Sequence, residues 1–572
     1  MKLRLLQIAC VVLTVLTFKT SAATLYVSLA STNPVPPYAG WSTAATNIQD
    51  AVDAANAGDL ILATNGVYAT GGRVVYGSLS NRVVVNKAVT IQSINGAGAT
   101  MIAGSQFNQN GGIPIRCVYL TNGAALIGFT LTNGNASPSG DPIQEQSGGG
   151  TWCESSSTIV SDCIFSGNFA YQFGGGAFRG TLINCALTNN SASYIGNSGG
   201  GGGGGAASNN LFDCNITGDS AYSYGGGAYG CALSNCLIVG NRSITGQFPG
   251  NGGGTAYSTL LNCTVSNNVA GASGGGVFMG IANGCLISSN SAFIAGGGAY
   301  SNALVNCVLH NNLSSSIGGG AYQSALVNCT VVSNAASGPS VQPAGGGVYG
   351  GGATNCIIYY NSALKDPNLS GSPSVIYCCT TPLPAGLGNI TNEPGLVNLT
   401  SGDFHLQSNA PCINSGNNTY VTSAADLDGN PRIVGGTVDI GAYEYQTPTS
   451  VLSYAWAQQY SLPTDGSVDY ADLDGTGFTV YQDWIAGLNP TNALSVLAML
   501  PPAPTNNPVG LVISWESVSN RTYFLQSSSN LAMRPAFSTI QSNLVGQPST
   551  TSYTDTSATN AGPYFYRVGV QQ

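Results

Sequence analysis

Residues 296–317 read GGGAYSNALVNCVLHNNLSSSI, and the next coil of the chain begins GGGAYQSALVNCTVVSN. The unit recurs along the chain, with cysteines at positions 163, 185, 214, 236, 263, 285, 307, 329, 356 and 378. Six of the nine intervals are 22 residues, and the other three are 27 or 29. A unit of constant length with occasional insertions is typical of a solenoid, in which each coil packs on its neighbours.

The positions within one unit predict short strands separated by turns. Cys307 and Leu309 lie two residues apart and so share one face of a strand. Asn306, before the cysteine, and Asn312, five residues after it, occupy positions that hold Asn or Asp in nearly every unit. Asn and Asp tolerate left-handed backbone, and the glycine run supplies a third turn. We therefore expect about three strands and three corners in each coil.

Stacked coils of this kind pair their strands in parallel, and parallel connections are right-handed. The sequence thus predicts an all-β protein, a right-handed parallel β-helix of about 22 residues per coil. A left-handed hexapeptide helix would repeat about every 18 residues and does not fit.

The cysteine column is predicted to face the core, and the Asn column to form a ladder of amides between coils. Metal or redox roles are disfavoured because the sequence has no C-x-x-C and only two histidines. Disulfides would suit an exported protein, but signal cleavage would leave 15 of the 16 cysteines, an odd number. We expect buried free thiols. If serine replaced Cys285, the sequence alone would identify no hydrogen-bond partner for the buried hydroxyl.

Composition restricts the partners of the protein. Glycine accounts for 79 of 572 residues, and Asp, Glu, Lys and Arg for only 6%, against a usual ~25%. The net charge is −9, with 14 basic residues. Nucleic acid and anionic membrane surfaces are therefore not expected as partners.

The N-terminus is predicted to direct export. Lys2 and Arg4 precede an apolar stretch from Leu5 to Phe18, and Ser21-Ala22-Ala23 supplies small residues for cleavage. The stretch is short for a membrane anchor, and no later segment has 18 uninterrupted apolar residues. We expect a secreted or cell-surface protein with no integral membrane segment after signal cleavage.

The remaining chain divides by composition. Residues 47–55 are expected to form a helix, begun by Asn47, that covers the open end of the first coil. Near the exit, residues 404–407 and 411–413 are expected to form a last strand pair. The predicted divisions are 1–23 signal peptide, 24–160 N-terminal cap and first irregular coils, 161–380 regular coils, 381–446 final coils and C-terminal cap, 447–495 calcium-loop linker, and 496–572 a small β-sandwich.

Residues 472–483, DLDGTGFTVYQD, have the spacing of a 12-residue calcium loop. The ligands would be the side chains of Asp472, Asp474, Thr476 and Asp483 and the carbonyl of Phe478, with Gly477 at the sharp turn. Thr476 and Asp483 are weaker ligands than the usual Asp and Glu, so we expect modest affinity for structural Ca²⁺. A metal-free turn is the alternative.

Catalytic residues are scarce in the coils. Between Cys163 and Cys356 the acids are Asp213 and Asp219, both in columns that Asn fills elsewhere, and the bases are Arg179, Arg242 and His310. A glycoside hydrolase needs a general acid and a second carboxylate. The candidates for such a site lie in and beside an insertion: Arg116, Asp141, Glu145, Glu154 and Asp162.

Several motifs resemble known exported proteins. The entry segment Thr46–Ala51 with Gly58-Asp59 resembles the capping segment of the pectate-lyase-like superfamily, including its family-nine lyases. The Gly-Gly-Gly-Ala-Tyr and Cys-x-apolar-x-x-Asn unit also resembles the repeats of polymorphic outer-membrane proteins. The segment 404–444, with DLDGNPR and DIGAYE, resembles the choice-of-anchor Q region, and its carboxylates are expected to form a cap held by Arg432. The calcium loop and sandwich resemble a C-terminal module of large exported proteins.

The resemblance implies a β-helix fold but not one function. Lyases of this superfamily hold calcium with clustered surface carboxylates and use Arg or Lys as the base. The sparse charge instead favours an exported, surface-associated scaffold or adhesin that binds neutral polysaccharide or cell-surface components. The alternative is a polysaccharide lyase or glycoside hydrolase.

Overall fold

The computed structural model describes residues 22–106, 112–193, 201–244, 249–338, 342–506, 508–559 and 562–571. The predicted signal peptide falls almost entirely outside the described residues. Within them, no helix has the length and apolar character needed to cross a membrane.

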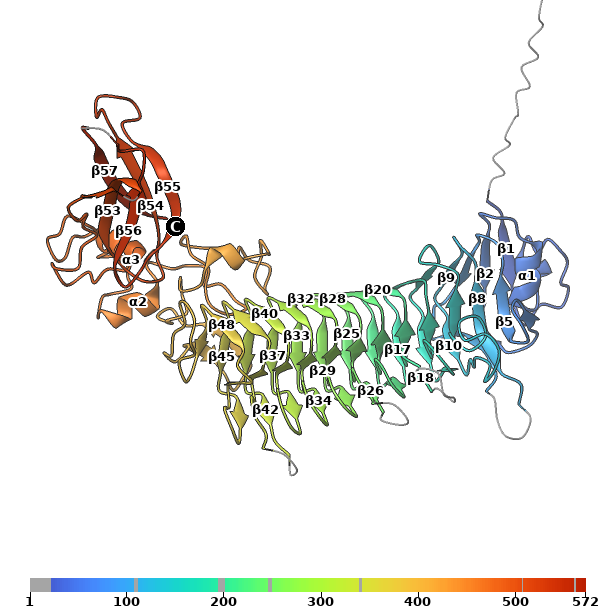
Figure 1. Cartoon of the computed structure of the whole chain (residues 1–572). Helices are drawn as coiled ribbons and strands as arrows, with labels where there is room; N and C mark the ends of the chain where they lie inside the picture. The colour runs from blue at the N-terminus through green and yellow to red at the C-terminus, as the bar shows by residue number, and fades with distance from the viewer. Residues whose placement is uncertain are drawn as a thin grey trace, which may run out of the picture.

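The described chain from residue 24 to residue 380 is a right-handed parallel β-helix (Figure 1). Three long sheets run along it, with 14, 13 and 13 strands in the described residues. The first runs from β1 (Thr24–Val27) to β48 (Ser374–Ile376), and the second from β3 (Gly66–Tyr68) to β49 (Cys379–Thr380). The third runs from β4 (Arg73–Val74) to β47 (Leu369–Ser370), and all pairs along the coils are parallel except that between β4 and β5 (Ser80–Val85).

Each regular coil contains one more strand than the sequence predicted. One coil comprises β35 (Ala299–Tyr300), β36 (Ala303–Val305), β37 (Val308–His310) and β38 (Leu313–Ser314). Strands equivalent to β38 form a fourth sheet, with nine strands in the described chain, from β14 (Phe169–Ala170) to β46 (Ser362–Ala363). These two-residue strands have no periodicity to detect, which is why the sequence did not reveal them.

The corner predicted before each cysteine is confirmed, although four strands give each regular coil four corners instead of three. The residue before each of the first nine repeat cysteines has a φ between 49° and 62°, in the left-handed region, as at Asn306 (49°) and Gly284 (62°). Asn, Asp and Gly reach this conformation with little strain, which explains the composition of the column.

The predicted amide ladder is confirmed as well. Nδ2 of Asn290 donates to Oδ1 of Asn312 in the next coil (3.0 Å) and to the carbonyl of Val265 in the preceding coil (2.9 Å). Oδ1 of Asn290 accepts from both nitrogens of Asn268 (2.9 and 3.0 Å). A fully buried amide is thus completely hydrogen-bonded, by asparagines of the two adjacent coils and by one backbone carbonyl.

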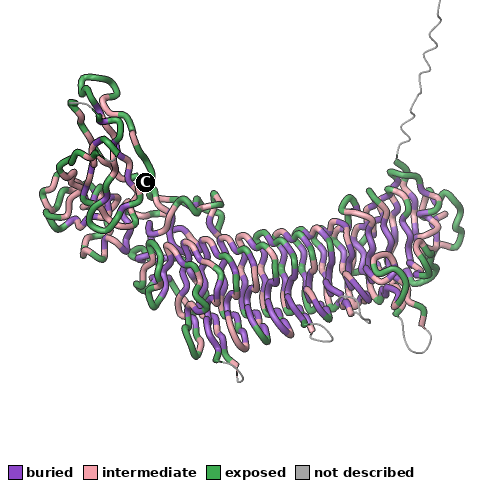
Figure 2. Tube along the Cα trace, viewed as in Figure 1, coloured by how far each residue is buried: buried purple, intermediate pink, exposed green. Residues whose placement is uncertain are grey.

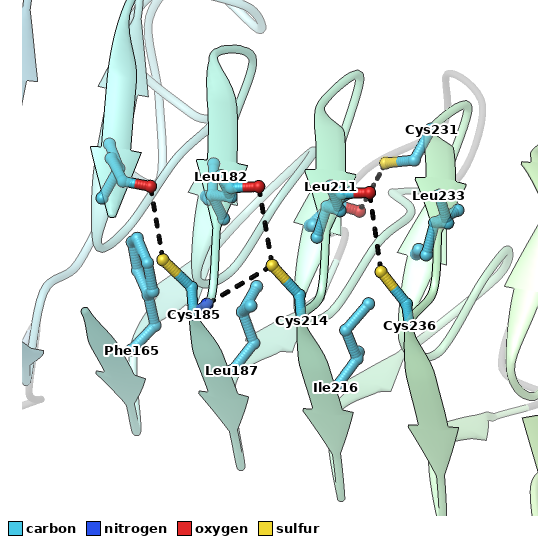
Figure 3. Close-up of a cluster of buried hydrophobic side chains, with 14 of the residues drawn as sticks. Phe165, Leu182, Cys185, Leu187, Leu211, Cys214, Ile216, Cys231, Leu233 and Cys236 are labelled. Atoms are coloured by element: carbon cyan, nitrogen blue, oxygen red, sulfur yellow. Dashed lines mark hydrogen bonds between the residues drawn. The ribbon is translucent and has the colours of Figure 1, made fainter. Parts of the chain in front are cut away.

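All 15 cysteines in the described residues are buried free thiols, as predicted. Figure 3 shows the column stacked beside the leucine and isoleucine columns, with sulfur atoms directed at backbone carbonyls. Sγ of Cys185 lies 3.4 Å from the carbonyl of Val160, and Sγ of Cys214 lies 3.5 Å from the nitrogen of Cys185. Figure 2 shows the same inner faces as a continuous buried stripe through the coils.

The entry cap forms as expected. Helix α1 (Ile48–Ala54) begins after Asn47, whose side chain accepts from the nitrogen of Asp50. Ile48, Ala51 and Val52 are buried in the same core as the coils. The helix therefore closes the end of the stack, where strand edges would otherwise be open.

The exit differs in one respect from the expectation. Strand β51 (Asp403–Leu406) pairs antiparallel with β50 (Leu396–Asn398), whereas residues 411–413 form a turn. Pro411 has no amide hydrogen, and Cys412 and Ile413 are buried by packing against the final coils instead of by pairing.

The C-terminal part contains a helical segment and a sandwich. The helices are α2 (Tyr454–Gln459) and α3 (Val480–Ala486). Six antiparallel strands form two three-stranded sheets around Trp515 and Tyr523: β52 (Ala503–Asn506), β53 (Val509–Ser517), β54 (Thr522–Ser528), β55 (Ser538–Val545), β56 (Ser549–Asp555) and β57 (Phe565–Gln571).

Candidate functional site

The acidic residues near the insertion hold loops in place. Glu145 accepts hydrogen bonds from the backbone nitrogens of Ser78 (2.7 Å) and Asp141 (3.0 Å), which lower the pKa of its carboxyl. Glu154 accepts from the hydroxyls of Tyr119 and Thr121, and the hydrogen bond from Tyr119 lowers its pKa. Both groups therefore stay ionised at neutral pH and are poorly suited to act as a general acid.

Arg116 and Asp162 are also engaged. The Arg116 guanidinium is fully buried and donates to the carbonyls of Gly148, Gln144 and Ser147 and to Oδ1 of Asn81. Burial lowers the pKa of Arg116 to about 9. Asp162 accepts from the side-chain amide of Asn184 at 2.7 Å. These predicted catalytic candidates thus have structural partners.

Asp213 and Asp219 occupy the turn and ladder columns, as the sequence predicted. Asp213 has a φ of 54°. Asp219 is fully buried in the amide ladder, where Oδ1 accepts from both nitrogens of Asn190 (2.6 and 3.0 Å). Burial raises the pKa of Asp219 to about 8, and Asp219 is enclosed in the core of the coils, out of reach of substrate.

An aromatic row follows the outer face of the third sheet. In β35, Ala299 points into the core and is fully buried, whereas Tyr300 lies on the opposite face and is half-buried. Successive ring centroids lie 4.8–6.4 Å apart along this face. We call this set of side chains the aromatic row: Tyr76, Tyr119, Trp152, Phe173, Phe178, Tyr224, Tyr229, Tyr257, Phe278, Tyr300, Tyr322 and Tyr349.

In two coils the strand position equivalent to Tyr300 holds alanine instead of an aromatic residue. Aromatic side chains from other positions fill these two gaps. Ala207 lies between Phe178 and Tyr229 in the strand register, and Phe173 bridges them with centroid distances of 6.4 and 5.5 Å. Ala256 leaves a similar gap before Phe278, which Tyr224 and Tyr257 occupy. Sequence reasoning recognised the Ala-Tyr pair of the repeat but missed the row, because the filling rings lie outside the repeated column.

The two ends of the row differ in access. Trp152 is buried, and its indole nitrogen donates to the carbonyl of Ile143 in the insertion (2.8 Å). At the other end Tyr300 and Tyr322 are stacked, with centroids 4.8 Å apart and ring planes 20° apart. Stacking occupies the faces of these half-buried rings, so their edges and hydroxyls remain for a ligand. Burial raises the pKa of Tyr322, which keeps its hydroxyl a hydrogen-bond donor.

The predicted calcium loop folds as a set of tight turns. Asp472 accepts from the backbone nitrogens of Gly475 (2.8 Å) and Gly477 (3.0 Å). Asp474 uses Oδ1 to accept from both the nitrogen and the hydroxyl of Thr476 (3.2 and 2.8 Å). No group of three or more His, Cys, Asp or Glu side chains in the described chain is arranged to hold a metal ion.

Asp483 is the unusual member of this loop. Its side chain belongs to α3 and is 1% exposed, and both carboxylate oxygens are buried without a hydrogen bond. Oδ2 of Asp474 is buried and unpaired in the same way. Burial, and then the charges of Asp474 and Asp472, raise the pKa of Asp483 to about 6. A cation bound here would pair with the buried oxygens of Asp483 and Asp474 and would offset the repulsion among Asp472, Asp474 and Asp483. Phe478, two residues before the helix, would contribute only its backbone carbonyl.

The carboxylates of the exit region form a cap, as expected. Arg432 is 1% exposed, donates to the carbonyls of Gly441 and Asp439, and lies 3.9 Å from Glu444. Asp439 accepts from the nitrogens of Asn414 (2.7 Å) and Tyr445 (2.6 Å). These groups tie the segment 412–445 together and are buried from solvent.

One exposed cluster near this cap was missed by sequence reasoning. His405 lies between Asp403 and Asp428, with both nitrogens 2.6 Å from a carboxylate oxygen, and its ring contacts Tyr443 at 4.2 Å. Partial burial disfavours the charged form of the His405 ring. The hydrogen bonds to Asp428 and Asp403 and the charges of these two residues together outweigh this effect, so the pKa of His405 is raised. The cluster joins β51 to the turn at 426–430. Because 23 residues separate Asp428 from His405, no local sequence motif indicates that the two side chains meet.

No family model matches the chain, and no curated protein matches it. Solved structures that resemble it include a pectate lyase, Pel9A, at 15% identity, with 75% of this chain and 97% of the other covered and a TM-score of 0.35. XylC in complex with xylose is 10% identical, covers 74% of this chain and 99% of its own, and has a TM-score of 0.37. A rhamnogalacturonan lyase is 14% identical, with 73% and 96% covered and a TM-score of 0.31.

Proposed function

We propose that the protein is an exported, surface-associated β-helix scaffold or adhesin that binds neutral polysaccharide along the exposed part of the aromatic row. The observation that carries the proposal is the line of half-buried tyrosines on one sheet face, including Tyr300, Tyr322 and Tyr349. Because one coil adds one hydroxyl at each strand spacing of ~4.8 Å, the face repeats along its length as an extended polymer does.

The low charge of the coils supports a neutral ligand. Hydroxyls and amides both donate and accept, as the hydroxyl groups of a sugar chain require. Among the described residues two guanidinium groups lie over the aromatic row: Arg179, 5.1 Å from Phe178 and 5.9 Å from Trp152, and the buried Arg116, 6.0 Å from Trp152. Arg116 is buried and already hydrogen-bonded, and the one remaining guanidinium, that of Arg179, offers little attraction to a polyanion.

A second candidate function, a polysaccharide lyase, is favoured by this same arginine. In the described residues the Arg179 guanidinium has neither a hydrogen-bond nor a carboxylate partner, whereas the buried Arg116 guanidinium donates to three carbonyls and to Asn81. Lyases of the pectate-lyase-like superfamily use Arg or Lys as the base, and an unpaired arginine beside a binding face has the residue type and the position for that role. Loss of any cleavage activity in Arg179→Ala would support this candidate.

The binding proposal is tested by removing hydroxyls while keeping the stack. The triple variant Tyr300→Phe/Tyr322→Phe/Tyr349→Phe should bind immobilised neutral polysaccharide about 10-fold or more weakly, since each lost hydrogen bond costs about 0.5–1.5 kcal/mol. Tyr222→Phe, at an exposed tyrosine outside the row, is the matched control. Equal binding by the triple variant and wild type would exclude the row as the binding face.

We also propose that Asp472, Asp474, Thr476, Asp483 and the carbonyl of Phe478 hold a structural Ca²⁺. The support is the unpaired, buried carboxylate of Asp483. Extracellular sites of this kind bind at about 10⁻⁴–10⁻³ M. Calcium would neutralise repulsion within the loop and anchor the start of α3.

Limited proteolysis tests the calcium proposal. Cuts at residues 447–495 should appear in chelator and be suppressed by millimolar calcium in the wild type. Asp483→Asn should abolish the protection, whereas Asp465→Asn, an exposed acid outside the loop, should retain it. Identical digestion of the wild type in both conditions would show that the loop binds no calcium.

A further inference from the structure

A cavity of about 1190 Å³ lies where the exit cap of the β-helix, the helical segment and the sandwich meet. Its walls come from the turns at 388–392 and 414–419, from α2 and α3, and from the sandwich turn at 520–522. Ligand sites are often found where structural units meet in this way. The volume exceeds that of a site for one small molecule, about 300–1,000 Å³, and so suits several linked units.

The lining is aromatic and amide-rich. Trp456 and Trp484 contribute indole rings from α2 and α3, and Tyr377, Tyr470 and Tyr481 add phenol rings. The other polar residues of the described lining are Asn, Gln, Ser and Thr, and among the described lining residues Arg521 is the only one with a charged side chain. Nη2 of Arg521 already donates to the carbonyl of Trp484 (3.1 Å).

Some polar side chains of this lining are already hydrogen-bonded within the chain, and others remain to bind a ligand. Asn418 is held from both ends, because Nδ2 donates to Gly436 and Oδ1 accepts from Val438, each at 2.8 Å. Gln459 and Asn520 are exposed and make no side-chain hydrogen bond to the described residues. The cavity thus has rigid walls and free amides near its aromatic rings.

We infer that this cavity binds a neutral oligosaccharide. An anionic ligand would need several cations, and a purely apolar ligand would leave the amides unpaired. A hydroxyl-rich chain satisfies amides that both donate and accept, while aromatic rings pack against its apolar ring faces. The inference stands on the cavity alone and does not require the aromatic row to bind.

The full chain is titrated with five neutral hexasaccharides, of β-1,4-glucose, β-1,4-xylose, β-1,4-mannose, β-1,3-glucose and α-1,4-glucose, and with hexagalacturonate. Calorimetry and tryptophan fluorescence report binding. At least one neutral hexasaccharide should bind, and more tightly than hexagalacturonate. Trp456→Ala should weaken that binding at least 10-fold.

A second variant guards against a folding defect. Gln459→Ala/Asn520→Gly removes only the exposed amides, keeps a left-handed residue at position 520 (φ 72°), and should weaken binding at least 3-fold. Trp41→Ala, at a 44% exposed indole in the entry cap, should bind as the wild type does. Binding that survives both cavity variants but is lost in the tyrosine triple variant would overturn the inference and favour the row. No binding of any neutral hexasaccharide, or preference for hexagalacturonate, would overturn it too.

Discussion

The regular coils and the loop before α3 both bury polar side chains, but they satisfy them differently. In the coils, Asn290 is fully buried, and its side-chain amide makes four hydrogen bonds to neighbouring coils. At the loop, Asp483 in the first turn of α3 is 1% exposed, and its carboxylate makes no hydrogen bond. In the repeated coils, each buried amide of the ladder finds its hydrogen-bond partners in the neighbouring coils. The buried carboxylate of Asp483 has no such partner in the described chain and therefore calls for a ligand from outside it.

The largest expected effect comes from breaking one rung of the ladder. Asn290→Leu removes four hydrogen bonds and leaves the carbonyl of Val265 and the nitrogen of Asn268 unpaired in the core. We expect a loss of about 3–5 kcal/mol in the free energy of unfolding, measured by urea denaturation. Thr259→Ala, an outward strand position, should change it by less than about 0.5 kcal/mol. An equal response of the two variants would contradict the ladder's role.

Asp219→Asn should strengthen the ladder at the rung where it is weakest. Nδ2 of Asn241 donates to the carbonyl of Ile216, but the matching atom of Asp219, Oδ2, is buried without a partner. Burial raises the pKa of Asp219 to about 8, so between pH ~4 and ~8 the folded chain holds a proton that the unfolded chain has lost. Stability therefore falls as pH rises through this range.

The gain from Asp219→Asn should accordingly grow with pH and level off above pH ~8, reaching on the order of 2–4 kcal/mol near neutrality. Urea midpoints at pH 4, 7 and 9 measure it. Asp213→Asn, at an exposed turn of the same coil, serves as the control for the loss of a carboxylate outside the core. A gain that is constant with pH would mean that Asp219 does not carry the proton.

The smallest effect is expected in the cysteine column. The nitrogen of Cys263 lies 3.4 Å from Sγ of Cys285, and Sγ lies 3.3 Å from the carbonyl of Asn283. Ser258 occupies an equivalent setting in a neighbouring column, accepting from a nitrogen at 3.1 Å and donating to a carbonyl at 3.0 Å. The sequence did not reveal these partners for a hydroxyl.

We therefore expect Cys285→Ser to lower stability by less than about 1 kcal/mol, and Cys285→Val, which cannot pair with these groups, to cost more. Thermal unfolding of both variants provides the measurement. A larger loss for serine than for valine would show that the polar partners contribute nothing.

The turn and ladder columns of the coils were predictable from the sequence, whereas the two-residue strands of the fourth sheet and several contacts that occur only once were not. The coil length, the left-handed Asn306 and the ladder position of Asn312 follow from columns that nine coils reinforce. The pairing of His405 with Asp428 and the filling of the row by Phe173 depend on contacts between positions that share no period. The structural role of Glu145, one of the candidate catalytic residues, was not predictable either, because its carboxylate binds the backbone of Ser78, which is distant in the sequence.

Whether the protein binds polysaccharide without cleaving it is tested by incubating the full chain with a panel of neutral and anionic polysaccharides. Bound protein is measured by co-sedimentation, and released fragments by mass spectrometry. We expect retention of the protein on at least one neutral polysaccharide and no fragments from any. Fragments that accumulate with time and disappear in Arg179→Ala would show that the protein is an enzyme and not only a binding scaffold.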